Sequence, residues 1–219
     1  ENLARSLIAL HDNDGAAPLV ESALALQRRI APRLAQAVHA RIQERELIEL
    51  ATRIDIARGQ LSAVESNLDA MLALAPDPAN DWIGRDTVAR LALLAIAAAA
   101  PGSQERERCE QRCRKEIEAA TANAPGSVEE LSPMHAVMRS NSLRTLVELE
   151  LELGNKSAAA ASQSQVTAGY RRAWTGQQTA RNKQRLASNL QRLAELREAA
   201  DDHSGAGAAR RELDELGQD

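Results

Sequence analysis

Five glycines, each in a polar turn between two segments of helical periodicity, divide this chain at similar intervals. They are Gly15, Gly59, Gly102, Gly154 and Gly205, and successive members lie 44, 43, 52 and 51 residues apart. Pro32 and Pro76 each stand 17 residues after one of the first two glycines, where a proline would end the preceding helix. This recurrence predicts a repeat built from pairs of helices.

The composition favours helices throughout. The chain has no phenylalanine, one tyrosine and two tryptophans among its 219 residues, whereas β-sheets draw on aromatic and β-branched side chains. Alanine, leucine, arginine, glutamate and glutamine are abundant, and these residues lose least side-chain freedom in a helix. We therefore expect an all-α fold. The net charge of -4 is too small to indicate a polyanionic partner for the whole molecule.

The breakers define five expected helix pairs, which cover residues 2–30, 33–75, 81–123, 133–174 and 177–216. We expect the second helix of the first pair to begin at Pro18 and the last helix to begin at Ala206. Ser132 followed by Pro133 is typical of a helix start. The sequence thus predicts one helical-repeat domain over residues 1–219, an α-solenoid of about five antiparallel helix pairs. Because the chain opens at Glu1 without methionine, we interpret it as excised from a longer protein.

Residues 147–153, VELELEL, can be interpreted in two ways. Their apolar residues alternate as in a strand, yet Leu143, Val147 and Leu151 are also spaced by four. The long, capped context favours a helix that is covered on two sides. The intervening Glu148, Glu150 and Glu152 are predicted to form a solvated face.

Two stretches, Ala57–Pro76 and Leu153–Gln163, resemble tetratricopeptide repeats. Each has a turn glycine followed by small or apolar residues early in the second helix, and the first stretch closes with a proline. Its matching positions are Gly59, Leu61, Val64, Leu68, Met71 and Pro76. Val64 and Met71 stand where the family usually has alanine, and the glycine spacing exceeds the family period of about 34 residues. The resemblance is therefore to a tetratricopeptide-like array with longer helices.

The segment Ala23–Arg29, ALALQRR, is similar to helices in the repeat regions that follow the kinase domain in many bacterial serine/threonine protein kinases. This similarity implies a signalling parent chain in which the present region senses a stimulus. A membrane span between kinase and repeats would place this region in the periplasm, and its absence would make it a cytoplasmic scaffold. The most apolar run, Leu91–Ala100, is half of the roughly 20 residues that cross a bilayer, so we expect no membrane insertion by this region.

Motifs of catalysis are absent from the sequence. It contains no G-x-x-x-x-G-K-[ST] phosphate loop, no H-E-x-x-H zinc pair and no G-x-S-x-G nucleophile elbow. We therefore predict no enzyme activity and no cofactor for this region. Cys109 and Cys113 lie four residues apart, on one helix face with Ile117 and Ala120. Core packing is the favoured interpretation of this pair, while a disulfide and a metal site stay open.

One charge pattern suggests a binding surface. Between Leu153 and Ala194 there is no acidic residue, while basic residues recur from Lys156 to Arg192. Arginine, tyrosine and tryptophan dominate binding hot spots, and the segment gathers such residues. The predicted partner-binding residues are Tyr170, Arg171, Arg172, Trp174, Arg181 and Arg185. The alternative is that these cations neutralise the acidic faces of neighbouring repeats.

The sequence thus predicts a non-catalytic binding or sensory module whose concave side holds a peptide, a protein or a small ligand, and an acidic protein or peptide is one such partner. Two other functions stay open, namely a nucleic-acid-binding regulator that uses the basic segment 156–192 and an all-α enzyme with an unrecognised active site. The sequence disfavours nucleic acid as the partner and leaves association into a homodimer open.

Overall fold

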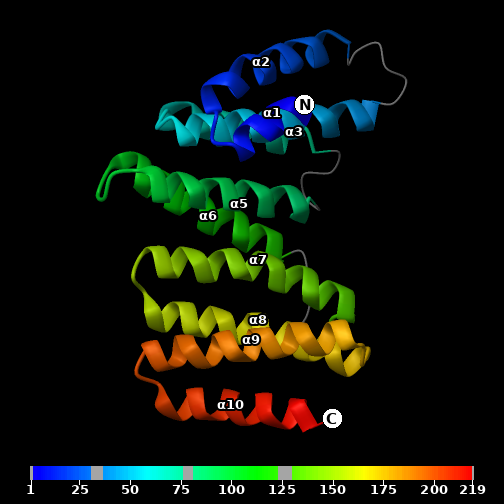
Figure 1. The fold of residues 1–219 in the computed structure, drawn as a ribbon, viewed down its shortest axis with the longest axis vertical. Coiled ribbons are helices and arrows are strands. Elements are labelled where there is room, and N and C mark those ends of the chain that lie inside the picture. The colour runs from blue at the N-terminus through cyan, green and yellow to red at the C-terminus, as the bar shows by residue number, and fades with distance from the viewer. Residues whose placement is uncertain (1, 31–36, 76–80, 123–129, 219) are drawn as a thin grey trace. The chain divides into compact units, whose positions relative to one another are not determined.

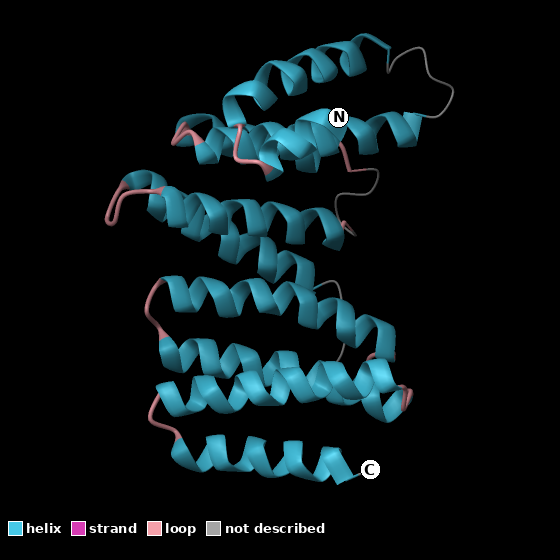
Figure 2. Ribbon diagram, in the orientation of Figure 1, coloured by secondary structure: helices cyan, strands magenta, loops and turns pink. Residues whose placement is uncertain are grey.

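The computed structural model describes residues 2–30, 37–75, 81–122 and 130–218. Every regular element within these residues is a helix, and none of them forms a strand (Figure 2). The all-α prediction is confirmed for this part of the chain. Residues 147–152 form the end of a long helix and Leu153 is its C-cap, so the helical interpretation of VELELEL is also confirmed.

Figure 1 shows the helices in their order along the chain. Their bounds are α1 Asn2–Ala9, α2 Asn13–Ile30, α3 Ala37–Ala57, the 3-10 turn η2 Leu61–Ala63, α4 Val64–Ala73, α5 Trp82–Ala98, α6 Gln104–Ala122, α7 Pro133–Glu152, α8 Lys156–Gly176, α9 Ala180–Ala199 and α10 His203–Gln218. The predicted breakers Pro32 and Pro76 lie outside the described residues. Ser132 does cap α7, since its side chain accepts a hydrogen bond from His135 N, with Pro133 at the first helical position.

Three of the five predicted turn glycines occupy left-handed turns. Gly59, Gly102 and Gly154 have φ angles of 71°, 74° and 76°, a conformation that costs glycine nothing. Gly15 and Gly205 instead lie inside the first turns of α2 and α10. Their assignment to turns is wrong, because the left-handed residues there are His11 and Asp201.

An Asp-x-x-Gly pattern begins three of the helices. The aspartate side chain accepts a hydrogen bond from the glycine N–H, and a Cβ on that glycine would collide with the aspartate. The pairs are Asp12–Gly15, Asp81–Gly84 and Asp202–Gly205, at 2.9, 3.0 and 2.9 Å. Because these caps fix the first turn, α2 and α10 begin before Pro18 and Ala206, and the starts predicted for them are wrong.

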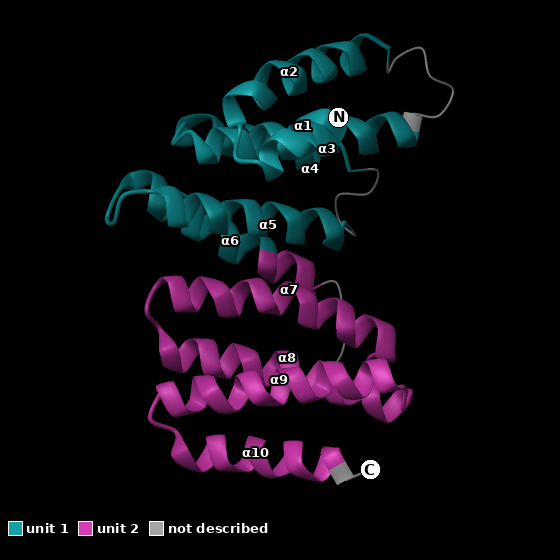
Figure 3. Ribbon diagram, viewed as in Figure 1, with its two compact units in different colours: residues 1–116 teal, residues 117–219 magenta. Residues whose placement is uncertain are grey.

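The chain divides into two compact units, Glu1–Glu116 and Ile117–Asp219 (Figure 3). The prediction of a single repeat domain over 1–219 stays a prediction. In the first unit, α1, α2 and α3 share a core that includes Ala16, Val20 and Ile54. Further along the same unit, Leu68 and Met71 of α4 and Val88 of α5 are fully buried.

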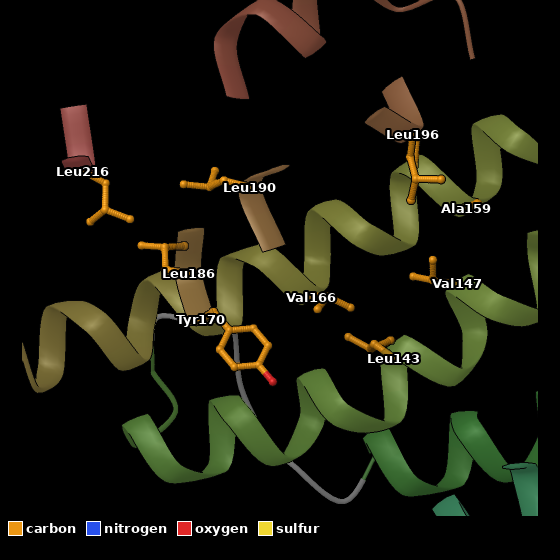
Figure 4. Packing of buried hydrophobic residues seen from close by; sticks show 10 residues of the cluster. Leu143, Val147, Ala159, Val166, Tyr170, Leu186, Leu190, Leu196 and Leu216 are labelled. Atoms are coloured by element: carbon orange, nitrogen blue, oxygen red, sulfur yellow. The ribbon is translucent and has the colours of Figure 1, made fainter. Parts of the chain in front are cut away.

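In the second unit, α7 packs on α8, α8 on α9 and α9 on α10. Figure 4 shows the cluster that joins them, with Leu143 and Val147 from α7, Val166 and Tyr170 from α8, and leucines from α9 and α10. The helices α7 and α8 approach closely at Gly169 of α8, where a Cβ would lie 2.7 Å from the carbonyl oxygen of Ala136 in α7. This packing positions α7, α8 and α9 around the candidate site.

Long-range ion pairs connect each of three helices to the helix two further along the chain. Arg112 of α6 pairs with Asp69 of α4 at 2.8 Å, and their sequence separation is 43 residues. Within the second unit, Arg171 of α8 pairs with Glu212 of α10 over 41 residues. Arg192 of α9 pairs with Glu148 of α7 over 44 residues. These separations match the length of one helix pair.

One of the three glutamates of VELELEL that were predicted to be exposed to solvent is buried. The side chain of Glu148 is partly exposed and Glu152 is exposed, but Glu150 is only 5% exposed. The carboxylate of Glu150 accepts a hydrogen bond from Asn155 Nδ2 at 2.9 Å, just beyond the end of the helix. The prediction for Glu150 is wrong because the turn at Gly154 folds back over that side chain.

Candidate binding groove between α7 and α9

The cysteine pair lies in the core. Cys109 is 6% exposed and Cys113 is fully buried, on the same face of α6 as the buried Ile117 and Ala120. The prediction of one buried stripe is confirmed. Both residues are free thiols, so the disulfide left open by the spacing is not formed. Among the described residues, no three His, Cys, Asp or Glu side chains are grouped so as to hold a metal ion.

We expect both thiols to react slowly with a thiol reagent in the native protein. Burial raises the pKa of the Cys109 thiol, and it raises that of Cys113 to about 12, so very little of the reactive thiolate is present at pH 8. Labelling with a chromogenic disulfide at pH 8 checks this, with the urea-unfolded protein as the fast control. Native labelling at the unfolded rate would contradict the burial.

A buried ion network on the same helix was not foreseen from the sequence. Arg112 is 7% exposed and Glu116 is 1% exposed. Arg112 Nε lies 3.0 Å from Glu116 Oε1, and Arg85 of α5 donates to Glu116 Oε2 at 2.6 Å. Burial lowers the pKa of Arg112, but its hydrogen bond to Asp69 and the nearby carboxylates raise that pKa above the ordinary value. The network joins α4, α5 and α6.

The predicted partner-binding residues differ in their exposure to solvent and in their contacts within the fold. Tyr170 is 4% exposed, and its hydroxyl donates to Asn141 Oδ1 at 3.0 Å; in Figure 4 the ring points toward α7. Trp174 packs against the same core. These two aromatics therefore anchor the fold, and Tyr170 also lines a cavity.

Arg171 and Arg172 are both held by other parts of the chain. Two nitrogens of Arg171 donate to the two carboxylate oxygens of Glu212 at 2.5 and 2.6 Å. Arg172 Nε donates to the carbonyl oxygen of Leu131 at 2.9 Å. For Arg171 the alternative interpretation, neutralisation of an acidic neighbouring helix, describes the contact that is present.

The cavity that carries the free cations lies between α7 and α9. Its volume is about 510 Å³, and α8 contributes Tyr170 to its lining. Asn141 and Arg144 line it from α7, and Arg185, Ser188 and Arg192 are among the residues that line it from α9. The sequence predicted Arg185 but not Asn141 or Arg144, because only the residues between Leu153 and Ala194, which include no acidic residue, indicated a binding surface, and α7 ends before them.

The electrostatics of this cavity favour an anion. None of its described lining residues is acidic. The guanidinium groups of Arg144 and Arg185 have no hydrogen-bond or ion-pair partner within the described part of the chain. Arg192, by contrast, donates to Glu148 at 2.6 Å. Since Asn141 uses its carbonyl oxygen to accept from Tyr170, its amide N–H groups remain available as donors.

A second cavity continues the first and is more apolar. It has a volume of about 340 Å³ and shares Arg185 with the larger cavity. Met134, Val137 and Met138 line it from α7, and Met134 is 64% exposed. We call the two cavities together the α7–α9 groove. Arg181, also predicted as a site residue, is exposed on α9 but lines neither cavity.

Comparisons with known proteins identify no relative, since no family model, no curated protein and no solved structure matches this chain. No helix within the described residues is long and apolar enough to cross a membrane.

Proposed function

We propose that this chain is a non-catalytic binding module, a tetratricopeptide-like α-solenoid that holds a segment of a partner protein in the α7–α9 groove. The observation that carries the proposal is that two guanidinium groups in one cavity, those of Arg144 and Arg185, have no partner among the described residues, and that this cavity has an apolar extension. Fixed cations and apolar surface in one groove are typical of peptide recognition.

The solenoid part of the proposal rests on recurrence along the chain. Consecutive helices pack on one another within each unit, and left-handed turns recur at residues 11, 59, 102, 154 and 201. Ion pairs that skip one helix have sequence separations of 41 to 44 residues. Helices that contact nearby helices of the chain in a recurring pattern are typical of a solenoid.

A protein segment is favoured over nucleic acid as the ligand. Single-stranded nucleic acid needs exposed aromatic side chains for stacking, but Tyr170 is buried and Trp174 packs on the core. Several cations of segment 156–192 are also engaged, because Arg171 and Arg192 pair with carboxylates. The apolar Met134 end of the groove has no role in binding a phosphate backbone.

Catalysis is disfavoured by the chemistry of the groove. The described lining of its larger cavity consists of guanidinium, amide and hydroxyl groups, and it contains no carboxylate, histidine or cysteine. Such a lining offers no ordinary general base at neutral pH. Binding without chemical turnover is therefore the function that these residues support.

The proposal extends to the parent chain only through the similarity of Ala23–Arg29 to repeat regions of bacterial serine/threonine kinases. In that context the module senses a stimulus, in the periplasm if a membrane span separates it from the kinase. The complete parent sequence tests this part, because a kinase motif set and a 20-residue apolar span are readable directly.

We expect charge reversal at Arg144 and Arg185 together to weaken peptide binding by about tenfold or more, since each charge-assisted hydrogen bond contributes roughly 1.5–3 kcal/mol. The ligand for this test is a peptide selected on the wild-type chain from a displayed library of random 12-residue peptides, and fluorescence anisotropy gives its affinity. Neither side chain has a partner in the part of the chain that the structure describes, so the melting temperature should change little.

Arg181→Glu is the matched control for this double variant, because it reverses an exposed charge on the same helix outside the groove. It should retain affinity within about twofold. Equal losses in the control and the double variant would contradict the groove as the binding surface.

A further inference from the structure

The order of side chains along the groove restricts its ligand beyond a generic partner segment. We infer that the groove takes a polypeptide segment in which a large apolar side chain and one or two acidic side chains occur in a fixed spacing. The apolar side chain lies at the Met134–Met138 end, and the carboxylates lie between Arg144 and Arg185. This inference rests on the proposed function.

The two ends of the groove differ in chemistry. At the beginning of α7, Met134, Val137 and Met138 give a surface that gains free energy by burying apolar area. One to two turns further along α7, Asn141 and Arg144 replace them. On the opposite wall Arg185 lines both cavities, so its guanidinium stands at the junction of the apolar and the cationic parts.

The free groups at the cationic end are nearly all donors. Arg144 and Arg185 have no acceptor within the described residues, and the free nitrogen of Asn141 also donates. Acceptor groups satisfy all of these donors, and the side-chain carboxylates of aspartate and glutamate are the acceptors that also carry the opposite charge. Charge complementarity therefore assigns acidic residues to this end.

Glu148 limits the acidic stretch on one side. It holds Arg192 through a 2.6 Å hydrogen bond and remains 45% exposed. Arg192 is thus already neutralised, and a further ligand carboxylate near Glu148 would meet a like charge. The carboxylates of the ligand therefore bind only in the part of the groove between Arg144 and Arg185.

The length of α7 sets the spacing in the ligand. Met138 and Met134 precede Arg144 by six and ten residues, which at a rise of about 1.5 Å per residue is roughly 9 to 15 Å. An extended peptide advances about 3.3 Å per residue. The apolar and acidic residues should therefore be separated by about three to five positions along an extended ligand.

The selection from random 12-residue peptides tests this inference, because both the sequences of the enriched peptides and their affinity for the chain can be measured. We expect enriched peptides to carry Leu, Ile, Met or Phe about three to five positions from Asp or Glu. A synthetic peptide of this kind should bind about tenfold more tightly than its scrambled version of equal composition. Met134→Glu should weaken it similarly, because Met134 is exposed and its replacement leaves the core untouched.

The outcomes separate the inference from the proposed function. Enriched peptides without acidic residues, or a scrambled peptide that binds within twofold, would overturn the inference while leaving a peptide-binding module. Failure of the wild-type chain to enrich any peptide would overturn the proposed function itself. If a 20-nucleotide single-stranded DNA bound more tightly than the selected peptides, and Arg144→Glu abolished that binding, the inference and the proposed function would both be overturned in favour of nucleic-acid recognition.

Discussion

Replacing Glu116 by alanine is expected to lower the free energy of unfolding by about 3 kcal/mol, because it removes a buried carboxylate that interacts with both Arg112 and Arg85. Glu116 is 1% exposed and lies within 3.0 Å of Arg112 Nε and 2.6 Å of Arg85 Nη1. Urea denaturation followed by circular dichroism measures the loss. A loss of this size would be a large fraction of the stability of an ordinary domain.

Glu110→Ala is the matched control on the same helix. Glu110 pairs with Arg114 four residues later at 3.2 Å, and both side chains are about one-third exposed. An exposed pair of this kind contributes about 0–1 kcal/mol. If Glu116→Ala cost no more than Glu110→Ala, the network joining α4, α5 and α6 would not be the stabilising feature that its burial indicates.

Replacing Gly169 by alanine should destabilise the second unit by about 1–3 kcal/mol or more, although alanine is ordinarily the better helix former by about 1 kcal/mol. The added Cβ would lie 2.0 Å from Ser140 Oγ and 2.7 Å from the carbonyl oxygen of Ala136. The serine can rotate, but the carbonyl belongs to the backbone of α7, so α7 and α8 must separate. Thermal unfolding followed by circular dichroism detects this loss.

Gly207→Ala in α10 is a control for which we expect a gain in stability instead of a loss. A Cβ there meets only Arg211 Nη1, at an ordinary contact distance of 3.6 Å. We expect this variant to be more stable than wild type by about 0.5–1 kcal/mol. Stabilisation by Gly169→Ala as well would refute the close approach of α7 and α8.

Local sequence signals were sufficient to predict that the chain forms helices, but they did not predict all of the residues at which the helices begin and end. Glycine turns and serine caps act through the backbone within four residues, so Gly59, Gly154 and Ser132 could be interpreted directly. The Asp-x-x-Gly caps at Gly15 and Gly205 were missed because glycine was taken as a breaker. Its role there is to leave room for the aspartate side chain.

Tertiary contacts explain what the sequence could not reveal about side chains. Arg112 and Glu116 occupy a strongly polar helix, and their burial depends on α4 and α5 packing over them. The groove likewise combines residues of α7 and α9 that are more than 40 positions apart. The i, i+3 and i, i+4 spacing of Met134, Met138, Asn141 and Arg144 was a signal for one shared face, but only the packed structure shows that Arg185 lies opposite.

The central claim, that the α7–α9 groove is the binding surface, is tested most directly by NMR of methionine methyl groups. The chain has three methionines: Met134 and Met138 line the groove, while Met71 is fully buried in the first unit and serves as internal control. On titration of methyl-labelled protein with a selected peptide, we predict that the Met134 and Met138 signals shift and that of Met71 stays fixed. A peptide that binds while both groove signals remain unmoved would contradict the claim.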